Sequence, residues 1–290
     1  MRRPLLLLTA LIVFAFAASP VNAASLQRTF RAHIGAGANG TVVVSVFSDG
    51  AGKVDYALKG LHKKTTFKVL IYKGRCGNLG TLATTFQSVV TNSSGAVTVS
   101  RWPSVSRIQD LWAANWTGPI SVKLKSATQS KCARLAFTHA TRVAIPAYNI
   151  DLPVVRTPSG YPYCNVAMYM GALSQPTEPG VTFIFAHARK GMFLPLLKQW
   201  QLNKGVNLIG KKVYVYASNN KVHTYQIYQV RTMNSIQSAV GTTAEELWLQ
   251  TSTGLHGTVA KLVVKAHRIA TASTTYAAAH PTPHIVHCGY

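Results

Sequence analysis

Short apolar alternations separated by turn signals recur along the first half of the chain. The segment GTVVVSVFSDGAGKVDYALKGL (residues 40–61) has two alternating runs around a Ser-Asp-Gly-Ala-Gly turn, and VTNSSGAVTVS (residues 90–100) repeats the arrangement. Alternation with period two buries one face of a strand, and a Gly-containing turn between two such runs is typical of a hairpin. The pattern therefore predicts an all-β unit over residues 28 to about 138, which we expect to be a β-sandwich.

The β pattern continues in the second half of the chain, where aromatic residues take part in the alternation. The segment KKVYVYASNNKVHTYQIYQV (residues 211–230) has aromatic residues at strand alternation, which favours the two sides of a hairpin. The run VTFIFAH ends at His187, and LWLQTSTGLHGT (residues 247–258) alternates as far as Thr251-Ser252 before it breaks at Gly254. A chain of 290 residues exceeds the usual size of one domain. We expect a mainly β chain with one domain over residues 24–140 and a second over residues 141–290.

The N-terminus has the pattern of an export signal. Arg2 and Arg3 precede an apolar run from Leu5 to Ala17, and a small-x-small ending stands at Val21-Asn22-Ala23. These features predict a cleaved signal peptide over residues 1–23 and a secreted or cell-surface protein. A signal retained as an N-terminal anchor is the alternative.

The cysteines fit an exported protein with disulfide bonds. Their number is even, their spacing is not that of a CxxC metal motif, and an oxidising compartment favours disulfides over thiols. Pairing within each expected domain joins Cys76 to Cys132 and Cys164 to Cys288. Each bond closes a long loop, which the chain-entropy account values at about 3 to 4 kcal/mol.

The charge of the chain is strongly positive. Lysine and arginine number 30 against 7 acidic residues, for a net charge of +23, and removal of Arg2 and Arg3 changes this balance little. Such a surface attracts polyanions and is sensitive to salt. For an exported protein we expect anionic wall polymers or lipid headgroups as partners. Nucleic acid is not favoured, because the lysines are scattered through strands instead of forming a basic helix.

The shortage of acids argues against several chemistries. The second half of the chain has four carboxylates: Asp151, Glu178, Glu245 and Glu246. Two of them are chain neighbours, which is a poor arrangement for flanking a glycosidic bond, and the set lacks the oxygen ligands of a calcium site. No P-loop, dinucleotide fingerprint or HExxH motif is present, so we expect no cofactor.

The C-terminal tail HPTPHIVHC brings several metal-binding residue types together. They are His280, His284, His287 and Cys288. An ordered tail could bind zinc or copper through them. The two prolines within the segment favour an irregular conformation, so we keep metal binding as a minor alternative.

Four segments in order resemble the sortase family, in particular the sortase-like proteins of the actinobacterial type. They are IPAYNIDLPVV (145–155), PGVTFIFAHARKGMFLPL (179–196), GKKVYVYASNNKVHTYQIYQV (210–230) and LWLQTSTGLHGTVAKLVVKA (247–266). The resemblance runs from about Val143 to Ile269. It implies a sortase-like β-barrel and an extracytoplasmic transpeptidase that cleaves a peptide and transfers it to an amine.

The resemblance places the catalytic histidine at His187 and the nucleophile at Ser252, where the family has a cysteine. This departure changes the chemistry. A thiol becomes a thiolate beside an imidazolium, whereas a serine hydroxyl needs a base to remove its proton during attack. His187 would therefore act as a general base. A carboxylate that orients it would help, and the sequence does not assign one.

The third catalytic position of the family is an arginine near the start of the last strand. Here the resemblance places Lys261 at that position, and a lysine supplies charge without the two-pronged geometry of a guanidinium. Arg189, two residues after His187, is a substitute candidate. Cys164 lies outside the segment that carries the nucleophile, and pairing with Cys288 is its expected state.

Two functions of different classes remain open from the sequence. In the first, the second domain hydrolyses or transfers a peptide acyl group through Ser252 and His187, with Lys261 or Arg189 stabilising the oxyanion. In the second, it is a noncatalytic sortase-fold module that binds a peptide or an anionic cell-wall polymer. A fold by itself does not decide between them.

Overall fold

The structure, a computed structural model, describes residues 24, 26–35, 37–158, 162–254 and 260–288. The predicted signal peptide over residues 1–23 lies outside the described residues. Within them, no helix is long and apolar enough to cross a membrane.

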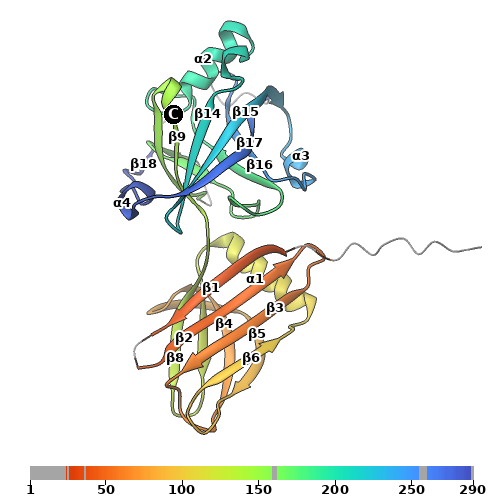
Figure 1. The fold of residues 1–290 in the computed structure, drawn as a ribbon, viewed down its shortest axis with the longest axis vertical. Helices are drawn as coiled ribbons and strands as arrows, with labels where there is room; N and C mark the ends of the chain where they lie inside the picture. The colour runs from red at the N-terminus through yellow and green to blue at the C-terminus, as the bar shows by residue number, and fades with distance from the viewer. Residues whose placement is uncertain (1–23, 25, 36, 159–161, 255–259, 289–290) are drawn as a thin grey trace, which may run out of the picture.

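The first half of the chain forms one curled antiparallel sheet of eight strands, in the order β5-β4-β7-β8-β1-β2-β3-β6 (Figure 1). Apolar residues on alternate positions point to its inner face, as in β2, where Val42, Val44 and Val46 are buried. The strands are β1 (Leu26–Ile34), β2 (Asn39–Phe47), β3 (Gly52–Lys59), β4 (Thr66–Arg75), β5 (Asn78–Val90), β6 (Val97–Arg101), β7 (Ile120–Lys125) and β8 (Ser130–Phe137). The predicted hairpin around residues 48–52 is confirmed as the turn between β2 and β3.

A helix that the alternation pattern does not predict packs on this sheet. Helix α1 (Val105–Thr117) places Ile108 and Leu111 in the same core as the inner face of the strands. This contact explains Gly52, because a Cβ atom there would lie 2.3 Å from the Ile108 side chain. The first half is therefore a curled sheet with a helix against its inner face.

The second half is a closed eight-stranded barrel in the order β10-β12-β13-β16-β17-β15-β14-β9. The predicted hairpin over residues 211–230 is confirmed as β14 and β15. The strands are β9 (Ala140–Ile145), β10 (Ile150–Arg156), β12 (Ala167–Tyr169), β13 (Val181–Phe185), β14 (Lys212–Ala217), β15 (Lys221–Met233), β16 (Glu246–Ser252) and β17 (Lys261–Ser273). The expectation of a mainly β chain ending in a barrel is thus confirmed.

Short elements connect and flank the barrel strands. The helix α2 (Leu194–Asn203) follows β13 and packs against β16. A separate two-stranded pair joins β11 (Tyr163–Cys164) to β18 (Val286–His287) near the end of the chain. The remaining elements are η1 (Pro146–Tyr148), η2 (Val206–Leu208), α3 (Gln237–Val240) and α4 (Tyr276–Ala279).

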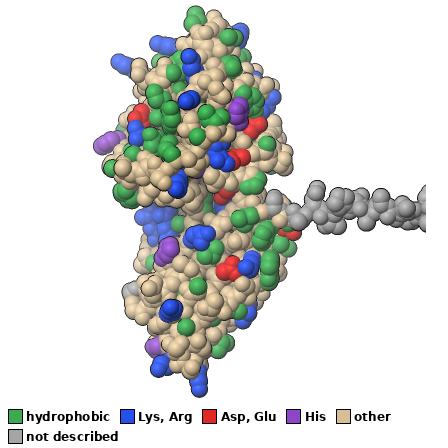
Figure 2. All heavy atoms as spheres, viewed as in Figure 1, with side chains coloured by type: hydrophobic (Ala, Val, Ile, Leu, Met, Phe, Trp, Pro, Cys, Tyr) green, Lys and Arg blue, Asp and Glu red, His purple; other side chains and the backbone are tan. Residues whose placement is uncertain are grey.

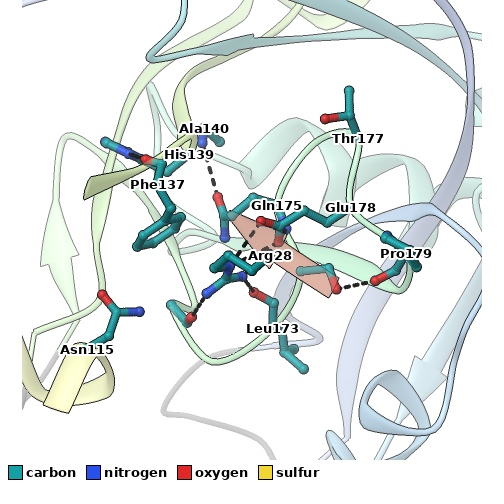
Figure 3. Close-up of polar contacts among 12 residues, drawn as sticks. Arg28, Asn115, Phe137, His139, Ala140, Leu173, Gln175, Thr177, Glu178 and Pro179 are labelled. Atoms are coloured by element: carbon teal, nitrogen blue, oxygen red, sulfur yellow. Dashed lines mark hydrogen bonds and ion pairs between the residues drawn. The ribbon is translucent and has the colours of Figure 1, made fainter. Parts of the chain in front are cut away.

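A buried arginine joins the two halves of the chain (Figure 3). Arg28 on β1 is 1% exposed and binds both carboxylate oxygens of Glu178, with its Nη2 2.9 Å from Oε2. It also donates to the carbonyl oxygens of Gly171 and Leu173, at 2.7 Å each. Burial raises the pKa of the Glu178 carboxyl, and the charge and hydrogen bonds of Arg28 oppose that rise. The ion pair thereby fixes the loop before β13 to the first sheet.

Candidate functional site

The residues that the sequence singled out lie on three neighbouring barrel strands or directly after them. Strand β16 lies between β13 and β17 in the barrel. It is antiparallel to β17, with Ser252 directly opposite Lys261, and parallel to β13, with Gln250 opposite Phe185. The N–H of Ala186 donates to the carbonyl oxygen of Gln250 at 3.1 Å and continues this pairing beyond β13.

This register places His187 and Ser252 at the same level of the barrel. Each residue stands two positions after the Phe185–Gln250 pair, on parallel chains. Side chains at equivalent positions of adjacent parallel strands point to the same face. His187, Ser252 and Lys261 therefore come from three adjacent chains at one end of the barrel, and all three side chains are partly buried.

Ser252 is the last residue of a tightly packed strand. Leu247, Leu249 and Thr251 before it are each no more than 1% exposed. After it, the hydroxyl of Thr253 donates to the carbonyl oxygen of Ala260 at 2.5 Å, which ties the chain after β16 to the chain before β17. Ser252 is thus held at the end of a fixed strand. Residues 255–259, which come shortly after it in the sequence, lie outside the described residues.

His187 is fixed by backbone contacts. Its Nε2 atom lies 3.1 Å from the carbonyl oxygen of Pro162, and because a carbonyl only accepts hydrogen bonds, this nitrogen carries the proton. In the neutral ring the Nδ1 atom is then the basic nitrogen. The carbonyl oxygen of His187 accepts from the N–H of Phe193, which closes the turn that leads into α2.

The four carboxylates of the second half are all engaged away from His187. Asp151 pairs with Arg142 at 2.5 Å, and Glu178 pairs with Arg28. Glu245 binds Arg268 at 2.7 Å, and Glu246 accepts from the indole N–H of Trp248 at 2.5 Å. The Pro162 carbonyl, which holds the Nε2 atom, is a group that orients the His187 ring.

Lys261 and Arg189 occupy different surroundings. Lys261 lies opposite Ser252 in the β16–β17 register. Arg189 is largely exposed, and its Nη1 atom lies 3.6 Å from the Sγ atom of Cys164. Of the two cations, Lys261 is the one that the register brings to Ser252.

Both predicted disulfides are present, and one of them lies against His187. Cys76 is bonded to Cys132, and Cys164 is bonded to Cys288. The two sulfur atoms of the second bond and a ring nitrogen of His187 all lie within 4.8 Å of one another. The sequence predicts the bond, but it contains no signal for this contact, since Cys288 lies far along the chain from His187.

The tail histidines do not gather into a metal site among the residues that the structure describes. The cluster of potential metal ligands that does form there consists of Cys164, His187 and Cys288. Its two sulfur atoms are bonded to each other. As disulfide sulfurs they are not thiolates, which is the form that binds metals.

The comparisons with known proteins find similarity in the second half of the chain. The family model of the sortase domain matches residues 143–269, a range that contains His187, Ser252 and Lys261. Among the curated proteins, no relative matches the chain.

Solved structures similar to the chain include three sortases. Sortase A of Listeria monocytogenes has 17% identity and a TM-score of 0.40, over 49% of this chain and 98% of that one. Sortase C-1 of Streptococcus pneumoniae has 25% identity and a TM-score of 0.38, over 45% and 66%. Sortase C2 of group B Streptococcus pilus island 1 has 20% identity and a TM-score of 0.37, over 44% and 73%.

Proposed function

We propose that this protein transfers or hydrolyses peptide acyl groups at the cell surface, with Ser252 as its nucleophile, because residues 143–269 match the family model of the sortase domain. The observation that carries the proposal is the register of β13, β16 and β17, which aligns His187, Ser252 and Lys261 at one level. A nucleophile, a base and a cation on adjacent chains are the groups that acyl transfer requires.

In the proposed reaction His187 acts as general base. Its Nδ1 atom accepts the proton of the Ser252 hydroxyl while the oxygen attacks the substrate carbonyl carbon. The Pro162 carbonyl, which holds the Nε2 proton, keeps the ring in the tautomer that this step needs. In a serine triad a carboxylate serves this purpose, so the backbone carbonyl is a neutral substitute.

Lys261 stabilises the negative charge that develops on the substrate oxygen. An ammonium group opposite the nucleophile supplies charge at the place where the oxyanion forms. His187 then returns the proton to the leaving amine, which leaves an ester on Ser252. Attack by an acceptor amine or by water on this ester, with His187 again as the base, completes transfer or hydrolysis.

Arg189 has a subsidiary place in this scheme. Its Nη1 atom lies 3.6 Å from the Cys164 sulfur, on the histidine side of the site. We assign the oxyanion to Lys261 because the register places that residue opposite Ser252, and we keep Arg189 as a second cation.

The test is turnover of a peptide thioester, with and without hydroxylamine as an acceptor amine and with and without a dithiol reductant. We expect acylation of the wild type and its loss in Ser252→Ala and His187→Ala, because residues that act as a unit fail together. Ser273→Ala, which removes an exposed hydroxyl from the end of β17, is the matched control and should leave the rate unchanged. Full activity of Ser252→Ala would overturn the proposal.

A noncatalytic binding function is the second candidate, and the surface charge favours it. Lysine and arginine side chains are spread over both halves of the face in Figure 2, with few acidic side chains among them. Ser252 and Lys261 also stand where the resemblance places a cysteine and an arginine. If no acyl-enzyme forms under any of the conditions above, binding of a peptide or an anionic wall polymer becomes the preferred function.

A further inference from the structure

The C-terminal segment is attached to the barrel at few points. After α4, residues 282–287 are all exposed, and Ile285 and Val286 leave 45% and 48% of their surface in solvent. The strand β18 is two residues long and pairs with β11 through Tyr163–His287 and Cys164–Val286. So little apolar burial and so short a strand stabilise the segment weakly. The Cys164–Cys288 bond is thus the main attachment of residues 281–288, which we call the strap.

The strap ends beside His187. Its last described residue, Cys288, is bonded to Cys164, and both sulfur atoms lie within 4.8 Å of a ring nitrogen of His187. The aromatic ring of Tyr163 also contacts the ring of strap residue His287, with centroids 5.2 Å apart. The disulfide-bonded end of the strap therefore lies beside the His187 ring.

We propose that the Cys164–Cys288 bond is a thiol–disulfide exchange site that locks the strap over His187, and that its reduction uncovers this histidine. The exchange itself is independent of acyl transfer. Only the role of this exchange in controlling activity rests on the proposed function, in which His187 is the base.

The two sulfur atoms differ in the way that such an exchange requires. Cys164 is 7% exposed, whereas Cys288 is only partly buried and is the accessible sulfur. The guanidinium of Arg189 lies 3.6 Å from Cys164 Sγ, where a positive charge favours a departing thiolate. An incoming thiolate therefore attacks Cys288, and Cys164 is the leaving group.

The exchange balances with a dithiol as the reductant. One thiolate of the dithiol attacks Cys288 Sγ, a new S–S bond forms, and the electron pair of the broken bond remains on Cys164 as a thiolate. The second thiol of the reductant then attacks the reductant sulfur that is bonded to Cys288, and Cys288 leaves as a thiolate. The dithiol becomes a cyclic disulfide, the protein disulfide gains two electrons, and two protons end on the protein thiols.

The experiment measures the exposure of His187 and of the strap on the full chain. Diethyl pyrocarbonate modification of His187 is mapped by mass spectrometry, and hydrogen exchange is followed over residues 282–287. Both are recorded before and after dithiothreitol and in Cys288→Ser. The matched control is Cys76→Ser/Cys132→Ser, which removes the other disulfide and leaves the strap locked.

We expect His187 modification and strap exchange to rise at least about fivefold on reduction and in Cys288→Ser, and to stay at wild-type values in the control. Circular dichroism checks that the barrel remains folded. Unchanged His187 modification after complete reduction of a folded protein would overturn the proposal. Neither readout uses acyl transfer, so inactivity of the protein toward peptides would leave this result intact and would count only against the proposed function.

A second measurement tests the leaving-group argument. In Arg189→Gln we expect reduction of Cys164–Cys288 to slow about threefold, since the departing Cys164 thiolate loses the positive charge beside it. The rate of Cys76–Cys132 in the same sample is the internal reference and should not change. Equal reduction rates of Cys164–Cys288 with and without the arginine would contradict the claim that Arg189 stabilises the departing Cys164 thiolate.

Discussion

Ser252, the last residue of β16, lies directly opposite Lys261, the first residue of β17. Antiparallel neighbours in register have Cβ atoms about 5 Å apart, so a long lysine side chain can reach the space in front of the serine. This pair is the basis for assigning a cation to the nucleophile.

The first prediction concerns Lys261. We expect Lys261→Met to slow acylation by about 10²-fold, since loss of one oxyanion donor typically costs 10² to 10³. Lys261→Arg should retain the charge and keep the rate within about tenfold of the wild type. Stopped-flow acylation with a peptide thioester gives both values. Lys198→Met, an exposed position on α2, is the control for charge loss, and an equal effect there would contradict the assignment.

The second prediction concerns the buried pair of Arg28 and Glu178. Removing one partner leaves the other charge buried without compensation, so Arg28→Met should lower the free energy of unfolding by about 3 to 5 kcal/mol. Arg31→Met, an exposed arginine on the same strand, should change it by less than about 0.5 kcal/mol. Urea denaturation measures both variants.

A further variant separates the charge from the packing in this pair. Arg28→Met/Glu178→Met should be more stable than Arg28→Met alone, because it leaves no unpaired buried carboxylate. A double variant that lost the sum of the two single effects would show that the ion pair is not the source of the stability.

The third prediction concerns pH and His223. Burial, with Arg268 next, lowers the pKa of this histidine to about 4, and its side chain is 1% exposed. An unfolded histidine has a pKa near 6.5, so the unfolded chain binds the proton first as the pH falls. The contribution of the neutral His223 to stability is therefore fully present above about pH 6.5 and is lost as the pH falls toward 4.

The loss of unfolding free energy that His223 causes between pH 7 and pH 5 is on the order of 1 to 2 kcal/mol. Urea unfolding at both values should show this loss in the wild type and a smaller loss in His223→Gln. His284→Gln, in the exposed strap, should behave as the wild type. A pH dependence that persisted unchanged in His223→Gln would assign it to other groups.

The fourth prediction concerns the basic surface. With 30 basic and 7 acidic residues, the protein should bind vesicles of phosphatidylglycerol and isolated anionic wall polymer, and should not bind phosphatidylcholine vesicles. The affinity should fall at least about tenfold between 50 and 300 mM salt, because counterions screen the attraction. Binding that was independent of salt would show that charge does not determine it.

The strands and the disulfide pairs could be predicted from the sequence because their signals are local or compositional. Alternation at Val42, Val44 and Val46 reports burial on one face, and an even number of cysteines limits the possible disulfide pairings. Helix α1 could have been found by its apolar residues Ile108, Leu111 and Trp112 at helical spacing, but the surrounding β pattern obscured this short signal.

The contacts between distant segments could not be predicted. Arg28 and Glu178 are 150 residues apart, and neither residue carries a local pattern that marks it as buried. The contact of Cys164 and Cys288 with His187 depends on the pairing of β11 with β18, two strands too short to show alternation. These contacts form only when the barrel closes and the C-terminal segment packs against it.

The central claim, that His187 activates Ser252, has a direct measurement. The reduced full-length protein is treated with a fluorophosphonate probe, which forms a stable adduct only with an activated serine, and the modified residue is located by peptide mass spectrometry. The account predicts one adduct, at Ser252, in the wild type and in Ser273→Ala, and no adduct in His187→Ala. A folded wild type without an adduct at Ser252, or equal labelling of Ser252 in His187→Ala, would contradict it.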